Sequence, residues 1–171
     1  MAAKPFRWLR MLPDALVLGP ATLGPLGRRL PAPGTWGSLA GLLTYAVLFR
    51  GAGAGALLAG TAVAAVVAAL LCGEAEARLG RSDPGCVVLD EVIALPLCFL
   101  GWGELTAAHP AWQVLLAGFA LFRFYDILKP LGISRLQDLP GGWGVVADDL
   151  GAALATAVTL HVANWAWLAL R

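Results

Sequence analysis

The chain has 171 residues, of which 59% are hydrophobic and only 13% carry a formal charge, so it is far more apolar than a typical soluble domain. Its mean hydropathy of +0.75 indicates a membrane protein. The formal net charge of +1, without a basic run interleaved with aromatic residues, argues against nucleic-acid binding.

The N-terminal residues 1–14 are predicted to form an interfacial segment. They begin with cations, but Pro13 and Pro20 interrupt the stretch that follows, whereas a cleavable signal peptide needs an unbroken apolar core. We therefore expect this segment to remain and to lie on anionic lipid. Its apolar contacts with the membrane would come from Phe6, Trp8, Leu9 and Leu12.

Five apolar segments follow, and they predict a compact all-α bundle embedded in the membrane, with four to five apolar helices. The segments are residues 36–49, 56–72, 87–102, 111–128 and 150–170. The first is short for a crossing of about 20 residues, so it either re-enters the membrane or continues through the Gly-rich stretch 51–60. No repeat or low-complexity tail suggests a second domain, so residues 1–171 are expected to form one domain.

Basic residues are distributed unequally over the two ends of these segments. If all five segments cross the membrane and the N-terminus lies in the cytoplasm, the far side carries only Arg50 and Arg171. This asymmetry satisfies the rule that cytoplasmic loops are enriched in lysine and arginine. The cytoplasmic side would carry Lys4, Arg7, Arg10, Arg28, Arg29, Arg78, Arg81, Lys129 and Arg135.

The same orientation places the polar clusters of four segments at the cytoplasmic face. Five of the side chains are carboxylates, which would repel one another in a medium of low dielectric constant unless a cation neutralised them. Carboxylate oxygens are hard ligands that suit Mg²⁺. The predicted catalytic and metal-binding residues are Asp90, Glu91, Asp126, Asp148 and Asp149.

Two cations and a glycine-rich loop would complete a site for a phosphate. Arg123 and Lys129 flank Asp126 at intervals of three residues, so all three lie on one side of a helix. Cations beside a metal favour a phosphate ligand. Residues 34–38 are expected to form a loop whose N–H groups, with the hydroxyls of Thr35 and Ser38, contact phosphate oxygens. Together these features describe a phospholipid head-group site.

Each signal also has a simpler explanation. Asp148 and Asp149 could only cap a helix, and Arg123 and Lys129 could extend to the membrane surface. The glycines of residues 141–144 could form no more than a flexible turn. The combination of these signals, rather than any single one, supports the prediction of a site.

Two other kinds of phosphatase site are disfavoured. Cys72 and Arg78 have the spacing of a cysteine-phosphatase loop, but the acids Glu74 and Glu76 between them would repel a phosphate. His109 and His161 fall near the opposite side of the membrane, which argues against a histidine nucleophile. The three cysteines are expected to be small core residues rather than disulfide partners.

Four motifs, taken in order and spacing, resemble those of the bacterial phosphatidylglycerophosphatase A family. They occupy residues 32–39, 88–93, 122–130 and 141–149, and the resemblance extends from about residue 15 to the end. It implies an Mg²⁺-dependent enzyme of the inner membrane that converts phosphatidylglycerol phosphate to phosphatidylglycerol. The charge distribution predicts that the site of this enzyme faces the cytoplasm. It also implies metal or catalytic roles for the five carboxylates and substrate contacts for Arg123 and Lys129.

Several alternatives remain open. The nucleophile is either a water or an Asp side chain. A small ion- or proton-coupled transporter would use the same acids as a relay, but it predicts acids spread through the depth of the bilayer. A structural subunit would leave Arg123 without a reason to lie in an apolar segment. A CDP-alcohol phosphotransferase would need a spaced Asp array that this sequence lacks.

Overall fold

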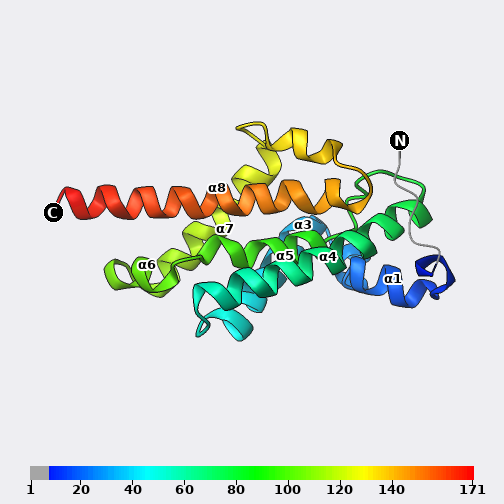
Figure 1. Ribbon diagram of the computed structural model, residues 1–171, viewed down its shortest axis with the longest axis horizontal. Coiled ribbons are helices and arrows are strands. Elements are labelled where there is room, and N and C mark those ends of the chain that lie inside the picture. The colour runs from blue at the N-terminus through cyan, green and yellow to red at the C-terminus, as the bar shows by residue number, and fades with distance from the viewer. Residues whose placement is uncertain (1–7) are drawn as a thin grey trace.

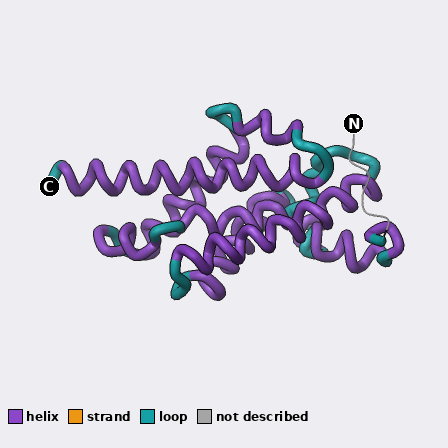
Figure 2. The backbone as a smooth tube through the Cα atoms, viewed as in Figure 1, coloured by secondary structure: helices purple, strands orange, loops and turns teal. Residues whose placement is uncertain are grey.

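The computed structural model describes residues 8–171, and these form helices joined by loops, without a strand (Figure 2). The all-α prediction is thus confirmed for the described residues. The α-helices are α1 (Asp14–Ala21), α2 (Pro25–Arg29), α3 (Pro33–Thr44), α4 (Ala54–Leu79), α5 (Leu89–Ala94), α6 (Trp102–Ala108), α7 (Ala111–Leu128) and α8 (Gly142–Ala169). Shorter helical turns are η1 (Leu9–Met11), the π-type η2 (Tyr45–Phe49), η3 (Leu95–Phe99) and η4 (Ile133–Asp138).

Three helices, α4, α7 and α8, are long and apolar enough to cross a membrane. The α5–η3 stretch and α6 qualify only together, as a pair bent by 60° at a short break. The described residues therefore provide three to four crossings by length and composition. The first predicted segment forms α3 and η2 and is not among them. It does not continue as a helix through residues 51–60, because η2 ends at Phe49 and α4 begins at Ala54.

The direction of the chain alternates from one long element to the next (Figure 1). As a result, the starts of α3, α5 and α8 gather at the same end of the bundle as the ends of α4 and α7. We call this the polar end. Arg50 follows η2 and Arg171 follows α8 at the opposite end, as the charge distribution predicts. The predicted convergence of helix ends is therefore present.

Helix α8 runs along the long axis of the molecule, and its first half packs against α4 (Figure 1). Glycines allow the backbones of the two helices to approach closely, since a β-carbon added at Gly73 would lie 2.6 Å from the backbone nitrogen of Gly142. Further from the polar end, Tyr45, Phe99 and Phe122 are buried in the largest apolar cluster. This packing fixes α5, α7 and α8 relative to one another next to the site.

The segment before α1 packs partly against the protein. Trp8 is exposed, but Leu9 is buried, contrary to the prediction that both contact lipid. Arg78 of α4 explains the difference, because it donates hydrogen bonds to the carbonyl oxygens of Leu9 and Leu12 at 2.8 and 3.0 Å. It also pairs with Asp14 at 2.8 Å. Phe6 and the rest of residues 1–7 lie outside the described residues.

The two disfavoured phosphatase sites are absent in the described residues. Cys72 and Arg78 lie within the continuous helix α4, where no phosphate-binding loop can form, and Cys72 is buried. His161 contacts the carbonyl oxygen of Leu100 at 2.7 Å, away from the polar end. All three cysteines are free.

Candidate active site

A cavity of about 310 Å³ opens at the polar end, between the start of α3, the α4–α5 loop, α5, α7 and α8. Every charged residue that the sequence analysis proposed for the site lines this cavity. These residues are Asp90, Glu91, Arg123, Asp126, Lys129, Asp148 and Asp149. Residues separated by up to 59 positions in the chain therefore share one polar space.

Four of the carboxylates lie in the first two turns of α5 and α8. Asp90 and Glu91 lie in the first turn of α5, where the partial positive charge of the backbone N–H groups favours an acid. Asp149 lies in the second turn of α8, because that helix begins at Gly142. The glycine-rich stretch 141–144 is therefore mostly helix rather than a flexible turn, and Asp149, like its neighbour Asp148, does not cap α8.

The end of α7 turns Lys129 toward α8. Lys129 adopts a left-handed backbone conformation with φ of 46°, and its N–H donates to the carbonyl oxygen of Tyr125 at 2.8 Å. Pro130 cannot continue the helix. The lysine ammonium forms an ion pair with Asp148. Two other residues that line the cavity, Ala32 and Asp83, also have positive φ, so backbone strain is concentrated around this site.

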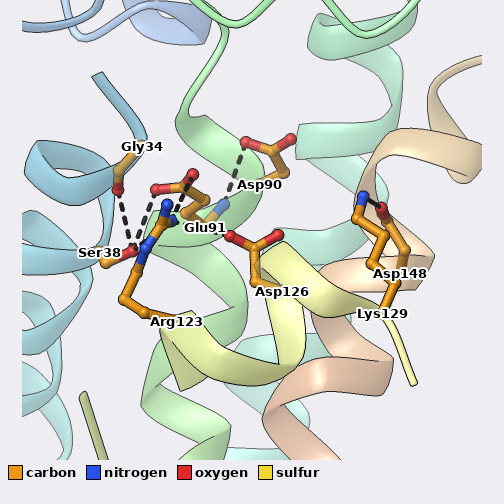
Figure 3. A network of polar contacts seen from close by, with 8 residues as sticks. All are labelled: Gly34, Ser38, Asp90, Glu91, Arg123, Asp126, Lys129 and Asp148. Carbon is orange, nitrogen blue, oxygen red and sulfur yellow. Dashed lines mark hydrogen bonds and ion pairs between the residues drawn. The ribbon is translucent and has the colours of Figure 1, made fainter. Parts of the chain in front are cut away.

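One side of the cavity holds a group joined by hydrogen bonds, which we call the Arg123 cluster: Ser38, Glu91, Arg123 and Asp126 (Figure 3). The Nη1 group of Arg123 donates to Asp126 at 2.8 Å, to Glu91 at 3.1 Å and to Ser38 at 3.2 Å. The single hydroxyl proton of Ser38 is shared between the carbonyl oxygen of Gly34, at 2.9 Å, and Oε2 of Glu91, at 3.1 Å. Each carboxylate of this cluster therefore contacts a cation.

The other side holds an acid cluster, formed by Asp90, Asp148 and Asp149, whose exposed fractions are 6%, 3% and 4%. Lys129 is the cation that pairs with it among the described residues (Figure 3). Asp148 Oδ1 and Asp149 Oδ2 are buried without a hydrogen-bond partner, and Asp90 Oδ1 accepts only the N–H of Glu91, at 3.0 Å. Of these three buried acids, only Asp148 is therefore paired with an ammonium group.

Lys129 remains charged in this setting. Its burial alone would lower the pKa of the ammonium, but the hydrogen bond to Asp148 and the nearby carboxylates raise that pKa above its usual value. A permanently charged lysine offsets part of the negative charge of the acid cluster and can contact an anionic ligand.

The predicted phosphate-binding loop at residues 34–38 is instead the beginning of α3. Pro33 occupies the first turn of this helix, a position that its fixed φ and missing N–H favour. Ser38 is fully buried and contacts Glu91 and Arg123 rather than the open cavity. Thr35 is partly exposed and is not among the residues that line the cavity. Neither of the two hydroxyls predicted to contact phosphate therefore faces the open cavity.

The sequence analysis did not identify Asp83, which lines the cavity from the α4–α5 loop. Its backbone N–H donates to Glu76 at 2.6 Å, and its carboxylate accepts a hydrogen bond from Gln137 at 3.3 Å. The one available signal was an acid in a turn containing proline and glycine shortly before Asp90. That pattern is common in surface loops, so it does not indicate a site.

The acid cluster has the chemical character of a site for a hard divalent cation. Its ligands would all be carboxylate oxygens, and the unpartnered atoms on Asp148 and Asp149 are available. As the side chains stand, no three histidine, cysteine or acidic residues of the described chain come close enough to hold one ion. Shared coordination therefore requires at least one side chain to turn.

The chain is similar to known proteins over most of its length. The family model described as phosphatidylglycerophosphatase A matches residues 20–164. The chain is 40% identical to phosphatidylglycerophosphatase A of Haemophilus influenzae over 139 residues, which cover 79% of this chain and 81% of that protein.

Two further relatives match over similar lengths. One, from Bacteroides thetaiotaomicron, is named "Putative phosphatidylinositol-3-phosphatase" and is 33% identical over 140 residues, covering 78% of this chain and 84% of that protein. Phosphatidylglycerophosphatase A of Escherichia coli is 30% identical over 138 residues, which cover 79% of this chain and 76% of that protein. No solved structure is a significant match.

Proposed function

The chain belongs to the phosphatidylglycerophosphatase A family, and from this membership we propose that it hydrolyses the terminal phosphomonoester of phosphatidylglycerol phosphate. The products are phosphatidylglycerol and inorganic phosphate, so the reaction is a step of phospholipid biosynthesis. Members of this family are phosphoric monoester hydrolases, and the apolar helices α4, α7 and α8 suit a membrane protein that acts on a phospholipid.

The observation that carries the proposal is the pairing of buried acids with two cations in one cavity. A phosphomonoester carries up to two negative charges, which Arg123 and Lys129 can offset from opposite sides of the cavity. Phosphoryl transfer depends mainly on positioning and on stabilising charge around phosphorus. The cavity contains both the cations and the carboxylates for that task.

We assign Mg²⁺ to the acid cluster, with Asp90, Asp148 and Asp149 as its ligands, because these side chains have oxygens without a partner. When bound, the ion would neutralise phosphate oxygens and favour ionisation of the attacking water. Glu91 and Asp126 belonged to the set of five metal ligands expected from the sequence. Both already contact Arg123.

The protein's own side chains have distinct tasks in this reaction. Arg123 and Lys129 bind the equatorial oxygens of the phosphate, and a carboxylate outside the metal site accepts the proton of the attacking water. The water oxygen forms a bond to phosphorus as the bond to the glycerol oxygen breaks, and the leaving oxygen takes up a proton from solvent to give the hydroxyl of phosphatidylglycerol. We assign the role of proton acceptor to Asp126, because it belongs to the Arg123 cluster and lines the cavity.

We place the polar end at the cytoplasmic face of the bacterial inner membrane. Arg28, Arg29, Arg81, Lys129 and Arg135 follow or close helices at this end, and such enrichment is typical of the cytoplasmic side. The terminal phosphate of a lipid in the inner leaflet would then reach the cavity from the membrane surface.

The transport alternative is weaker than the enzymatic one. A relay requires acids at successive depths between the two membrane faces. The described acids instead collect at the polar end, and Glu104, at the start of α6, is the exception. The arrangement favours chemistry at one membrane face.

Phosphate release from purified full-length protein in mixed micelles tests the proposal. The substrates are phosphatidylglycerol phosphate, phosphatidic acid and phosphatidylinositol 3-phosphate, each with Mg²⁺ and with excess EDTA. We expect Mg²⁺-dependent release from phosphatidylglycerol phosphate and little from the others. Preference for phosphatidylinositol 3-phosphate would replace the assigned substrate, and absence of release from all three lipids by folded protein would refute the proposal.

A further inference from the structure

Glu91 differs from the three residues of the acid cluster because both of its carboxylate oxygens already have partners. Oε1 accepts from Arg123 at 3.1 Å, and Oε2 accepts from Ser38 at 3.1 Å. A carboxylate oxygen has two lone pairs, so one hydrogen bond does not by itself exclude a metal ion. In Glu91, however, both oxygens are directed at Arg123 and Ser38, and an ion would have to share them with these donors. Asp148 and Asp149 each retain a buried oxygen without a partner.

The surface of α3 is shaped to hold the Glu91 side chain. A β-carbon added at Gly34 would overlap Oε1 of Glu91 and would lie 3.1 Å from Nη1 of Arg123. A β-carbon at Gly37 would lie 2.5 Å from Oε2 of Glu91. Both glycines lie in the first turns of α3, so the carboxylate rests against a helix start, where negative charge is favoured.

This contact leaves part of the Arg123 guanidinium available. Its three hydrogen bonds within the described residues all use Nη1, so Nη2 and Nε donate none there. The guanidinium is planar and rigid, and fixing one edge therefore fixes the direction of the other donors. Arg123 also lines the cavity, in which a phosphate would lie.

We propose that Glu91, together with Ser38, positions Arg123 for the phosphate of the substrate and does not bind the metal. This inference rests on the proposed phosphatase function and divides the five carboxylates expected from the sequence into two roles. Glu91 acts through Arg123, whereas the acid cluster holds the ion. The close packing of Gly34 and Gly37 against Glu91 serves the first role.

Metal binding in the absence of substrate is the first test. We would titrate purified wild-type protein, Glu91→Gln and Asp149→Asn with Mn²⁺ and follow free Mn²⁺ by electron paramagnetic resonance. Glu91→Gln should bind with a Kd within about twofold of wild type, whereas Asp149→Asn should weaken binding by at least about tenfold. If Glu91→Gln weakens Mn²⁺ binding as much as Asp149→Asn does, the positioning role is wrong.

Steady-state kinetics with the lipid substrate is the second test. Glu91→Ala should raise KM about tenfold or more while changing kcat less, as expected for loss of one charge-assisted hydrogen bond. Glu91→Gln keeps an acceptor for Arg123 and should recover part of this loss. Circular dichroism and gel filtration establish that each variant is folded. A fall in kcat with KM unchanged would contradict the positioning role.

A double-variant comparison tests whether Glu91 acts through Arg123. Glu91→Gln combined with Arg123→Lys should have a KM within about twofold of that of Arg123→Lys alone, because the positioned group is already lost. Multiplicative effects of the two changes would show that they act independently and would overturn the inference.

The glycine contact provides a matched pair of variants. Gly34→Ala should raise KM because its β-carbon displaces Glu91, although alanine favours the helix. Gly55→Ala in the first turn of α4 is the control, since nothing lies within 4 Å of the added carbon. Equal KM values for the two variants would show that the contact between Gly34 and Glu91 has no role in positioning Arg123.

These measurements separate two kinds of failure. If wild-type protein binds Mn²⁺ but releases phosphate from none of the three lipids, the proposed function fails. If the wild-type enzyme is active but Glu91→Gln loses Mn²⁺ binding, the proposed function stands and the positioning role fails.

Discussion

The two sides of the cavity pair their charged groups in different ways. In the Arg123 cluster, two carboxylates share one guanidinium, and a buried hydroxyl completes the hydrogen bonding. In the acid cluster, only one of three buried carboxylates is paired with an ammonium, and two oxygens have no partner. The first group is complete within the protein, whereas the second requires another positive charge.

This difference indicates separate tasks. In a buried network whose hydrogen bonds are all made, loss of one side chain disturbs the geometry of the remaining ones. Such a network is suited to holding a donor, here Arg123, in a fixed position. Buried carboxylates without a partner destabilise the protein until they are protonated or bind a cation. Under the proposed function, the acid cluster therefore binds the metal ion and the Arg123 cluster holds a donor in a fixed position.

The largest expected effect is that of Asp149→Asn in the acid cluster. It removes a charge and a candidate metal ligand, so we expect kcat to fall at least about a hundredfold, beyond the loss typical for groups that only support ligands. The melting temperature in EDTA should rise, because a buried carboxylate without a cation is replaced by a neutral amide. Near-normal turnover in detergent would exclude this residue from the metal site.

Lys129→Met removes the ammonium that pairs with the acid cluster. We expect the free energy of unfolding of the metal-free protein to fall by about 1–3 kcal/mol. This is less than for a fully buried ion pair, because the lysine side chain is 21% exposed. Added Mg²⁺ should then raise the melting temperature more than in wild type, since the ion replaces the missing charge.

Thermal unfolding with and without Mg²⁺ measures both effects of Lys129→Met. The exposed Arg135, which also lies at the polar end, provides the control: Arg135→Met should leave the response to Mg²⁺ as in wild type. If the two variants respond alike to Mg²⁺, Lys129 does not neutralise the acid cluster.

The smallest effect is expected outside both clusters. Cys72 is buried in α4 between apolar residues of α1 and α8, and Cys72→Ser places a hydroxyl there at a stability cost of about 1 kcal/mol. Turnover per folded molecule should stay within about twofold of wild type in the phosphate-release assay. A large loss of turnover in folded protein would restore the cysteine mechanism.

The sequence predicted the partners in the cavity better than their roles. Periodicity and charge distribution were sufficient to bring Asp90, Asp126 and Asp149 to one end of an all-α bundle. Helix α7 has the predicted limits, because Pro110 precedes it and Pro130 follows it closely. Local signals of this kind depend on neighbouring residues, which a sequence displays directly.

Features that depend on packing between distant segments were not predictable. The start of α8 at Gly142 depends on its close contact with Gly73 of α4, and without that contact a glycine-rich stretch resembles a turn. Likewise, a helix start at Pro33 with glycines against Glu91 resembles a loop when only its composition is considered. The division between Glu91 and Asp149 has no local signature, because it depends on which acid Arg123 reaches.

The most direct test of this division is the position of a metal ion in crystals grown with Mn²⁺, located by its anomalous scattering. We expect a peak within about 2.2 Å of carboxylate oxygens of the acid cluster, with Asp149 among the ligands. Glu91 should remain bonded to Arg123 and Ser38. A peak coordinated by Glu91, with Arg123 released, would contradict the separation of the two clusters.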